Sequence, residues 1–124
     1  MANPIYGQNK ADNFQDLQVI TVDSPVLSSA GTVYAAMPWK CTVVSVYWAA
    51  NVALTTAKST LTLKTAQGTC AGTHEIAHES AVGSSGKLTP TSNNVVLTGG
   101  TLEIENDAAP DAGQVTFTIV CQVA

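Results

Sequence analysis

The 124-residue chain has no arginine and few charged residues of either sign. Charged side chains make up 11% of it, against the ~25% that is usual in soluble domains. Five lysines and nine acidic residues give a net charge of −4, whereas nucleic-acid binding depends on clusters of basic side chains. The same deficit disfavours attachment to an anionic membrane surface. We therefore expect neither nucleic acid nor membrane among the partners.

Long apolar runs and disulfide patterns are also missing. No stretch approaches the ~18 consecutive apolar residues that a membrane-spanning helix needs. Residues 1–16 lack the cationic start and apolar stretch of a secretory signal, so we expect a soluble protein made without export. The three cysteines, Cys41, Cys70 and Cys121, are too few for a disulfide framework. We expect them to be reduced and to act as small hydrophobic side chains.

Threonine, valine, alanine, serine and glycine take the place of the missing charges. Thr and Val are β-branched, and their stiff side chains suit a strand better than a helix. After residue 16 the apolar residues alternate with a period of two, which is typical of strands that bury one face. This pattern predicts strands at 17–22, 32–37, 41–50, 59–65, 94–98, 101–105 and 114–123, and we count 73–79 as an eighth.

About eight short strands separated by turn residues predict an all-β fold. We expect an antiparallel β-sandwich, jelly-roll-like, that occupies residues 17–124 as a single domain. A seven-stranded immunoglobulin-like sandwich is the alternative. Residues 1–16, which contain Pro4 and Gly7 but no apolar period, predict an extended N-terminal arm. Residues 51–58 have no clean period and predict a loop or a single helical turn.

The segment 41–50 is the most apolar part of the chain. Strict alternation would place Val44, Val46 and Trp48 on one face. It would place Val43, Ser45 and Tyr47 on the other. Because both faces are mostly apolar, the pattern predicts a central strand or a strand whose outer face is covered.

Residues 74–78 spell H-E-x-x-H, the signature of zinc proteases. On a helix, His74 and His78 would share a face and bind one zinc while Glu75 activates its water. Glycines on both sides leave room for only about nine helical residues, and an extended segment would separate the imidazoles by about 13 Å. A structural zinc on Cys70, His74 and His78 needs the same helix. We expect no metal here and keep a small zinc-dependent hydrolase as an alternative function.

Three further groups of residues could carry a function. Trp39 and Trp48, with Tyr47, could form a surface platform that stacks on sugars, which makes a carbohydrate- or ligand-binding β-sandwich module another alternative; tryptophan in a small sandwich is more often core. Residues 83–87 lack the spacing of a phosphate-binding loop. The acidic residues of 103–111 lack the pattern of a calcium loop and predict a solvated edge. We expect no cofactor and no catalytic residue.

The polar arm MANPIYGQNKADNFQD, the Thr/Val/Ala-rich strands and the stretch NNVVLTGGTLEI at 93–104 resemble small phage virion proteins that decorate or cement capsids. The resemblance covers most of the chain. It implies a non-enzymatic β-sandwich that forms homodimers or homotrimers on the capsid exterior and bridges neighbouring subunits of the major capsid protein. Such a protein is a component of the virion and is assembled in the host cytoplasm.

The arm carries three large apolar side chains, Ile5, Tyr6 and Phe14, in otherwise polar surroundings. They could pack against the chain's own sandwich or against a neighbouring molecule, and the sequence leaves both open. An extended arm that orders on docking buries a large area with few residues, and many copies on one shell add avidity. We expect Ile5, Tyr6 and Phe14 to anchor the arm to the shell or to a sister subunit.

Overall fold

The alternating segments form strands in the computed structural model, which describes residues 17–123. Seven strands have six or more residues: β1 (Leu17–Asp23), β2 (Gly31–Ala36), β3 (Cys41–Thr55), β4 (Ser59–Thr65), β8 (Ser85–Pro90), β10 (Thr101–Asn106) and β11 (Ala112–Val123). Four have two residues: β5 (Gly68–Thr69), β6 (Gly72–Thr73), β7 (Glu75–Ile76) and β9 (Val95–Val96). The described residues contain no helix.

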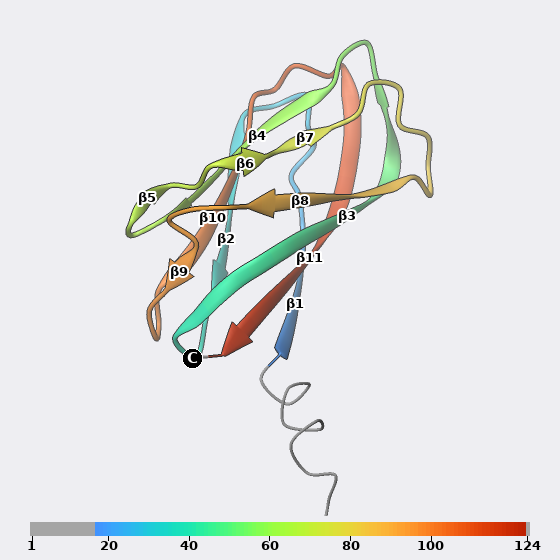
Figure 1. Cartoon of the computed structure of the whole chain (residues 1–124). Helices are drawn as coiled ribbons and strands as arrows, with labels where there is room; N and C mark the ends of the chain where they lie inside the picture. Colours follow the sequence, from blue (N-terminus) through green and yellow to red (C-terminus); the bar gives the residue numbers. More distant parts are fainter. Residues whose placement is uncertain (1–16, 124) are drawn as a thin grey trace, which may run out of the picture.

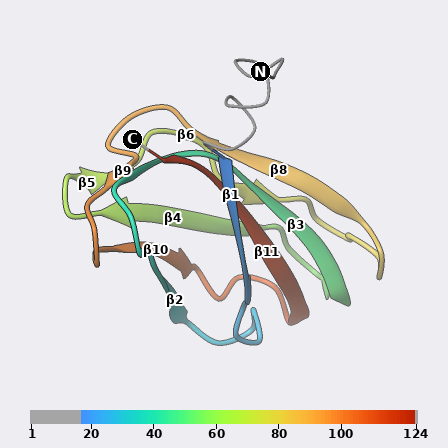
Figure 2. The same cartoon turned by 90° about the horizontal axis from the view of Figure 1, so that it is seen from below.

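These strands form two antiparallel sheets that pack against each other (Figures 1 and 2). The strand order is β1-β11-β3-β8-β6 in the first sheet and β2-β10-β4-β5 in the second. Successive long strands alternate between the sheets, and β11 lies between β1 and β3 while β10 lies between β2 and β4. This is the strand order of a jelly roll, so the predicted fold class is confirmed.

The segment 68–76 connects the two sheets at one edge. Its ends, β5 and β7, pair with β4 of the second sheet, whereas β6 between them pairs with β8 of the first. The predicted single strand at 73–79 is therefore wrong. Between β5 and β7, which pair with β4, the chain pairs with β8 instead. Gly72 permits this crossing: its φ is 127°, and a Cβ there would overlap the carbonyl oxygen of Thr89.

A β-bulge in β3 corrects the predicted faces of 41–50. Val43 pairs with Cys121 and Ser45 with Val120, so Val44 is an extra residue in the ladder. The bulge allows Val43 and Val46 both to be fully buried, which strict alternation forbids. β3 is a central strand, as expected, because it pairs with β11 on one side and β8 on the other.

Two other regions differ from the sequence predictions. Residues 51–55, expected in a loop or helical turn, continue β3, because Val52 and Thr55 pair with β11. The strand Ser85–Pro90 has no counterpart in the predicted set. The sequence did not predict this strand because it contains a glycine and a proline, which are typical of turns. It forms a strand because it pairs with β3.

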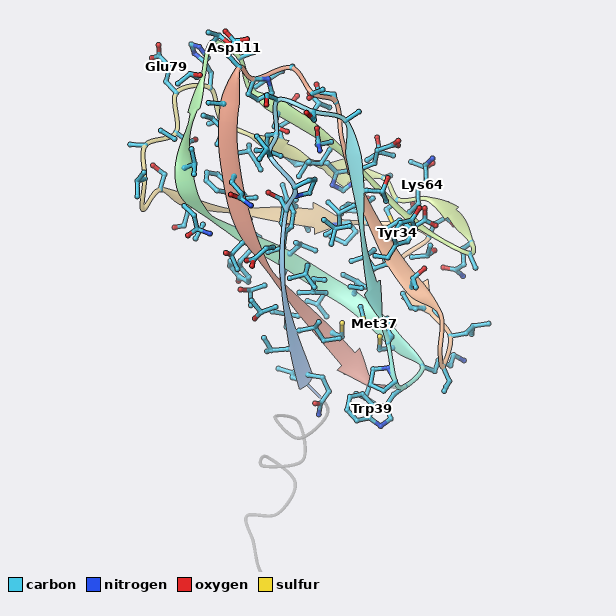
Figure 3. The ribbon with its side chains drawn as sticks, turned by 180° about the vertical axis from the view of Figure 1, so that it is seen from behind. Tyr34, Met37, Trp39, Lys64, Glu79 and Asp111 are labelled. Atoms are coloured by element: carbon cyan, nitrogen blue, oxygen red, sulfur yellow. The ribbon has the colours of Figure 1, made fainter. Side chains whose placement is uncertain are left out.

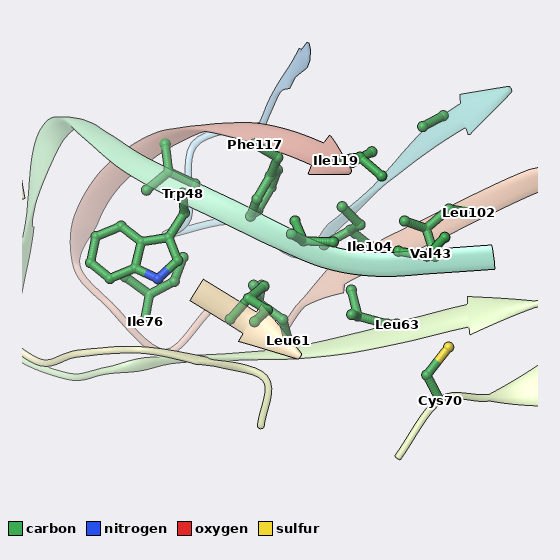
Figure 4. Packing of buried hydrophobic residues seen from close by; sticks show 14 of the residues in the cluster. Val43, Trp48, Leu61, Leu63, Cys70, Ile76, Leu102, Ile104, Phe117 and Ile119 are labelled. Atoms are coloured by element: carbon green, nitrogen blue, oxygen red, sulfur yellow. The ribbon is translucent and has the colours of Figure 1, made fainter. Parts of the chain in front are cut away.

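Side chains from both sheets fill one core. Ile20, Ile119, Val46 and Leu88 lie in register across the first sheet. Figure 4 shows core residues of both sheets, among them Phe117 of β11 and Leu63 of β4, pointing into the space between the layers. As predicted for 101–105, Leu102 and Ile104 are buried while Glu103 and Glu105 point outward.

Candidate docking surface

The H-E-x-x-H segment is not helical. Glu75 and Ile76 belong to the extended β7, and His78 lies in an exposed turn. Ile76 is fully buried and so fixes the segment against the core. Among residues 17–123, no three His, Cys, Asp or Glu side chains are grouped as ligands of one metal ion would be. The segment does not adopt the geometry on which the zinc-hydrolase alternative depends.

The polar residues of this segment have structural partners instead. His74 Nε2 lies 3.1 Å from the carbonyl oxygen of Cys70, and the His74 carbonyl accepts a hydrogen bond of 2.7 Å from the Leu61 amide. Lys58 Nζ donates to Glu75 Oε2 over 2.8 Å on the surface. This hydrogen bond and the charge of Glu75 raise the pKa of Lys58. These contacts hold the crossing segment in place.

The two tryptophans of the proposed sugar platform occupy different environments. Trp48 has 6% of its surface exposed and belongs to the core (Figure 4), whereas Trp39 is 47% exposed in the turn between β2 and β3. Tyr47, next to Trp48 in the chain, points out of the opposite face of β3. The platform prediction is therefore wrong for Trp48, and Trp39 remains as a single exposed indole.

The three cysteines are free and buried, as predicted. Cys121 Sγ donates to Met37 Sδ over 3.8 Å, at the end of the core where β11 finishes. Burial raises the pKa of the Cys41 and Cys70 thiols, and burial together with the neighbouring Cys41 raises the pKa of Cys121 to about 12. Thiols held in the protonated form are poor nucleophiles and poor metal ligands, so these cysteines act as core residues.

The outer face of the first sheet carries a cluster of outward-pointing apolar side chains, four of them exposed and Val120 half-buried. Leu17 and Val19 come from β1, Val120 from β11, and Val44 and Tyr47 from β3. Val19 pairs with Val120, which pairs with Ser45 beside the bulged Val44. Val19 is 61% exposed, and Val44 and Tyr47 are exposed by nearly half. We call these five residues the Val19 face.

Neutral and oppositely charged residues surround the Val19 face. Tyr47 lies in a row with Thr21, Thr118 and Lys87, in register from β1 to β8, and the row beyond it runs from Asp23 to Ser85. Asp23 Oδ1 accepts a hydrogen bond of 2.9 Å from Thr116 Oγ1. Asp23 on β1 and Lys87 on β8 thus lie on opposite sides of this face, and the residues in register between them are uncharged.

The outer face of the second sheet is different in character. There Tyr34, Glu103 and Lys64 lie in register across β2, β10 and β4, with Glu105 in the next row. Lys64 Nζ lies 3.9 Å from Glu105 Oε1. Exposed antiparallel sheets are usually polar in this way. An apolar face that residues 17–123 leave uncovered, such as the Val19 face, is characteristic of a protein-binding surface.

A second exposed apolar feature lies at one end of the sandwich. Trp39 precedes Cys41, which pairs with Val123, and the adjacent Gln122 pairs with Leu17 at the start of β1. Figure 3 shows Trp39 at this end. We call Trp39 and the first residue of β1, Leu17, the Trp39 end. Residues 1–16 join the sandwich here; the predicted anchors Ile5, Tyr6 and Phe14 lie outside the described residues.

The Val19 face is absent from the sites predicted by sequence, although the sequence contains a signal for it. Large apolar residues occupy both phases of the first strand: Ile20 and Val22 point toward the core, while Leu17 and Val19 point outward. Residues 41–50 are likewise apolar on both faces. The signal was visible in each strand, but only the strand order shows that the outer residues are neighbours.

No protein-family model, curated protein or solved structure matches the chain. Within the described part of the chain, no helix is long and apolar enough to cross a membrane.

Proposed function

We propose that this protein is a non-enzymatic virion structural protein that decorates or cements a phage capsid. It binds the outside of the shell, bridges neighbouring subunits of the major capsid protein and stabilises their contacts. The proposal places it on the capsid exterior after assembly in the host cytoplasm. It draws on the resemblance of the arm and strands to such proteins and on the apolar surfaces of the sandwich.

One observation carries the proposal: the exposed Trp39 lies at the end of the sandwich where β1 starts. Tryptophan is enriched among residues that dominate protein–protein binding energies, because its indole buries a large area with few rotatable bonds. The chain preceding Leu17 contains the predicted anchors Ile5, Tyr6 and Phe14. We take Trp39 and these three side chains as the candidate anchors.

The chemistry of the surface suits broad contact with a protein shell. Most outward residues of the first sheet are Thr, Ser, Ala or Val, so few charges lose their water on docking. A fully extended stretch of sixteen residues spans at most about 55 Å. Cementing needs no reaction, because contacts present only in the assembled state stabilise that state by mass action.

The proposal is tested with empty shells assembled from the major capsid protein of the same virus. Full-length protein is mixed with the shells, and bound protein is measured by co-sedimentation at physiological ionic strength. We expect saturable binding and a higher melting temperature of the shell. Absence of binding by the unmodified protein would reject the proposal.

Two variants locate the docking site. Trp39→Ala and the triple variant Ile5→Ala/Tyr6→Ala/Phe14→Ala should each weaken binding by about tenfold or more. Tyr34→Ala, which removes an exposed aromatic residue from the opposite sheet, is the matched control and should bind normally. Unchanged binding by both variants would exclude the Trp39 end. Glycan binding that is lost in Trp39→Ala would instead support the carbohydrate-binding alternative.

A further inference from the structure

We propose that the open edge of β1 receives an extended segment of the major capsid protein, which adds a strand to the first sheet beside Leu17–Asp23. This inference rests on the proposed function: it names the element that takes the shell segment and the form that the segment adopts. Such binding by strand addition draws its affinity from main-chain hydrogen bonds and its specificity from alternate side chains.

The edge of β1 is open and regular. β1 is the end strand of the first sheet, and among residues 17–123 it pairs only with β11. Its ladder with β11 has seven consecutive pairs without a bulge. Sheets usually protect an edge with a proline, a lysine or a bulge, and residues 17–22 contain no proline and no lysine. An edge strand of this kind is a template for a further strand.

The register with β11 identifies the main-chain groups that point to the open edge. Ser24 N donates to the Val115 carbonyl oxygen over 2.8 Å, at the end of the β1–β11 ladder. Because the N–H and C=O groups of successive residues in a strand point to opposite sides, the even-numbered residues of β1 bond to β11. The residues whose N–H groups point to the open edge are Val19, Thr21 and Asp23.

The core is incompletely covered along this edge. Ile20 and Val22 of β1 and Val33 of β2 pack against the core but remain partly exposed. Their neighbours in the next strand, Ile119 beside Ile20 and Phe117 beside Val22, are fully buried. β1 and β2 are end strands of the two sheets and lie close together. A strand added to β1 would therefore cover apolar surface that the described part of the chain leaves partly exposed.

The two faces of β1 define the side chains of the added strand. Those that point inward meet Ile20 and Val22, and those that point outward lie beside Leu17 and Val19. Both environments are apolar. The capsid segment that fits the edge therefore carries apolar side chains in both phases, because neighbouring side chains on one face of a sheet pack against each other.

The position of the edge favours a shell segment as its occupant. β1 begins at Leu17, which belongs to the Trp39 end, the surface that we propose to dock on the shell. The open edge is thus continuous with the proposed contact. A segment of the capsid protein that reaches the Trp39 end can extend along β1 without crossing another strand of the described fold.

Hydrogen exchange of the full-length protein, free and bound to empty shells, tests the edge. In the free protein the amides of Val19, Thr21 and Asp23 should exchange faster than those of Ile20 and Val22, which bond to β11. Shell binding should slow the exchange of the three edge amides by about tenfold or more.

Three outcomes would reject the inference. Edge amides that remain unprotected on bound shells would overturn it and leave the proposed function standing. Edge amides that are already protected in the free protein would also overturn it, because the edge is then occupied without the shell. Absence of shell binding would reject both the inference and the proposed function.

A proline variant tests the main-chain contact. Thr21→Pro removes one edge-facing N–H but keeps the hydrogen bonds with β11, because proline is tolerated on the open side of an edge strand. It should weaken shell binding by about tenfold. The matched control Thr21→Ala removes the same side chain, keeps the N–H, and should bind within about twofold of the unmodified protein.

Circular dichroism verifies that both Thr21 variants are folded. Binding of Thr21→Pro equal to that of the unmodified protein would overturn the inference. An equal loss in Thr21→Pro and Thr21→Ala would also overturn it, because the side chain rather than the main chain would then make the contact. The hydrogen-exchange result needs no variant and decides the question if Thr21→Pro does not fold.

Discussion

Gly86 lies directly opposite Trp48 in the ladder between β3 and β8, and its missing side chain leaves the space that the indole fills. A Cβ on Gly86 would lie 2.7 Å from Trp48 Nε1 and 2.8 Å from Cε2. These distances are too short for non-bonded atoms. The burial of Trp48 therefore depends on a glycine 38 positions later in the chain.

Gly86→Ala should lower the free energy of unfolding by about 1–3 kcal/mol, because the added methyl group forces the indole or the strand to move. Denaturant unfolding followed by circular dichroism measures the change. Ser85→Ala, at an exposed neighbouring position, is the control and should stay within about 0.5 kcal/mol of the unmodified protein. In a Trp48→Phe background the cost of Gly86→Ala should shrink. An equal cost in both backgrounds would contradict the contact.

Variants with one tryptophan should report the two environments separately. Trp48→Phe leaves the exposed Trp39, whose emission should be red-shifted and readily quenched by acrylamide. Trp39→Phe leaves the buried Trp48, whose emission should be blue-shifted and protected from acrylamide. Steady-state fluorescence with a quencher titration measures both. Equal quenching of the two variants would show that Trp48 is not in the core.

The two histidines of the H-E-x-x-H segment should differ in their effect on stability. His74→Ala removes the contact with the Cys70 carbonyl and should cost about 1 kcal/mol. His78→Ala alters an exposed turn and should cost less than about 0.5 kcal/mol. Thermal unfolding with and without added zinc measures both effects. Stabilisation of the unmodified protein by zinc, lost in both variants, would restore the metal-site interpretation.

Stability should fall as the pH rises above 9. Burial, together with Cys41, raises the pKa of the Cys121 thiol from its ordinary 9.0 to about 12. Between these values the unfolded chain has released the thiol proton while the folded chain retains it, so unfolding becomes more favourable. Below pH 9 both states hold the proton and the group has no effect. The slope reaches about 1.4 kcal/mol per pH unit for one such thiol.

Melting temperatures of the reduced protein between pH 7 and pH 11 measure this dependence. Cys121→Ala should be less stable at pH 7, because it leaves a cavity, but its stability should fall less steeply above pH 9. The control Met37→Leu changes the adjacent core residue without removing a titrating group and should keep the full slope. Identical slopes in all three proteins would show that Cys121 is not the group responsible.

The amino-acid sequence by itself determined which residues of most strands are buried. In 101–105 and 114–123 the large apolar residues other than Val120 fall in one phase, and every buried residue there belongs to that phase. The buried residues of a strand can be predicted locally when one face is buried and the other is exposed to solvent, because successive side chains point to opposite faces. The number and kind of these strands were enough to indicate a jelly roll.

Three features depended on residues distant in sequence. The bulge at Val44 exists only against β11, and β8 is a strand because β3 pairs with it and fills the space at Gly86. The segment of His74 is not one continuous strand, because it divides its hydrogen bonds between β4 and β8. Each of these was mispredicted, because neither a pairing partner nor a packing neighbour is encoded locally.

The candidate docking surface combines both kinds of information. The exposed apolar phase of β1 is present in the sequence, as is the exposed Trp39 between two strands. Only the tertiary structure makes Val19, Val120 and Val44 neighbours, because β11, the last strand, inserts between β1 and β3. Local sequence decides which side chains point away from the core. Long-range strand pairing decides which of these outward side chains lie next to one another on the surface.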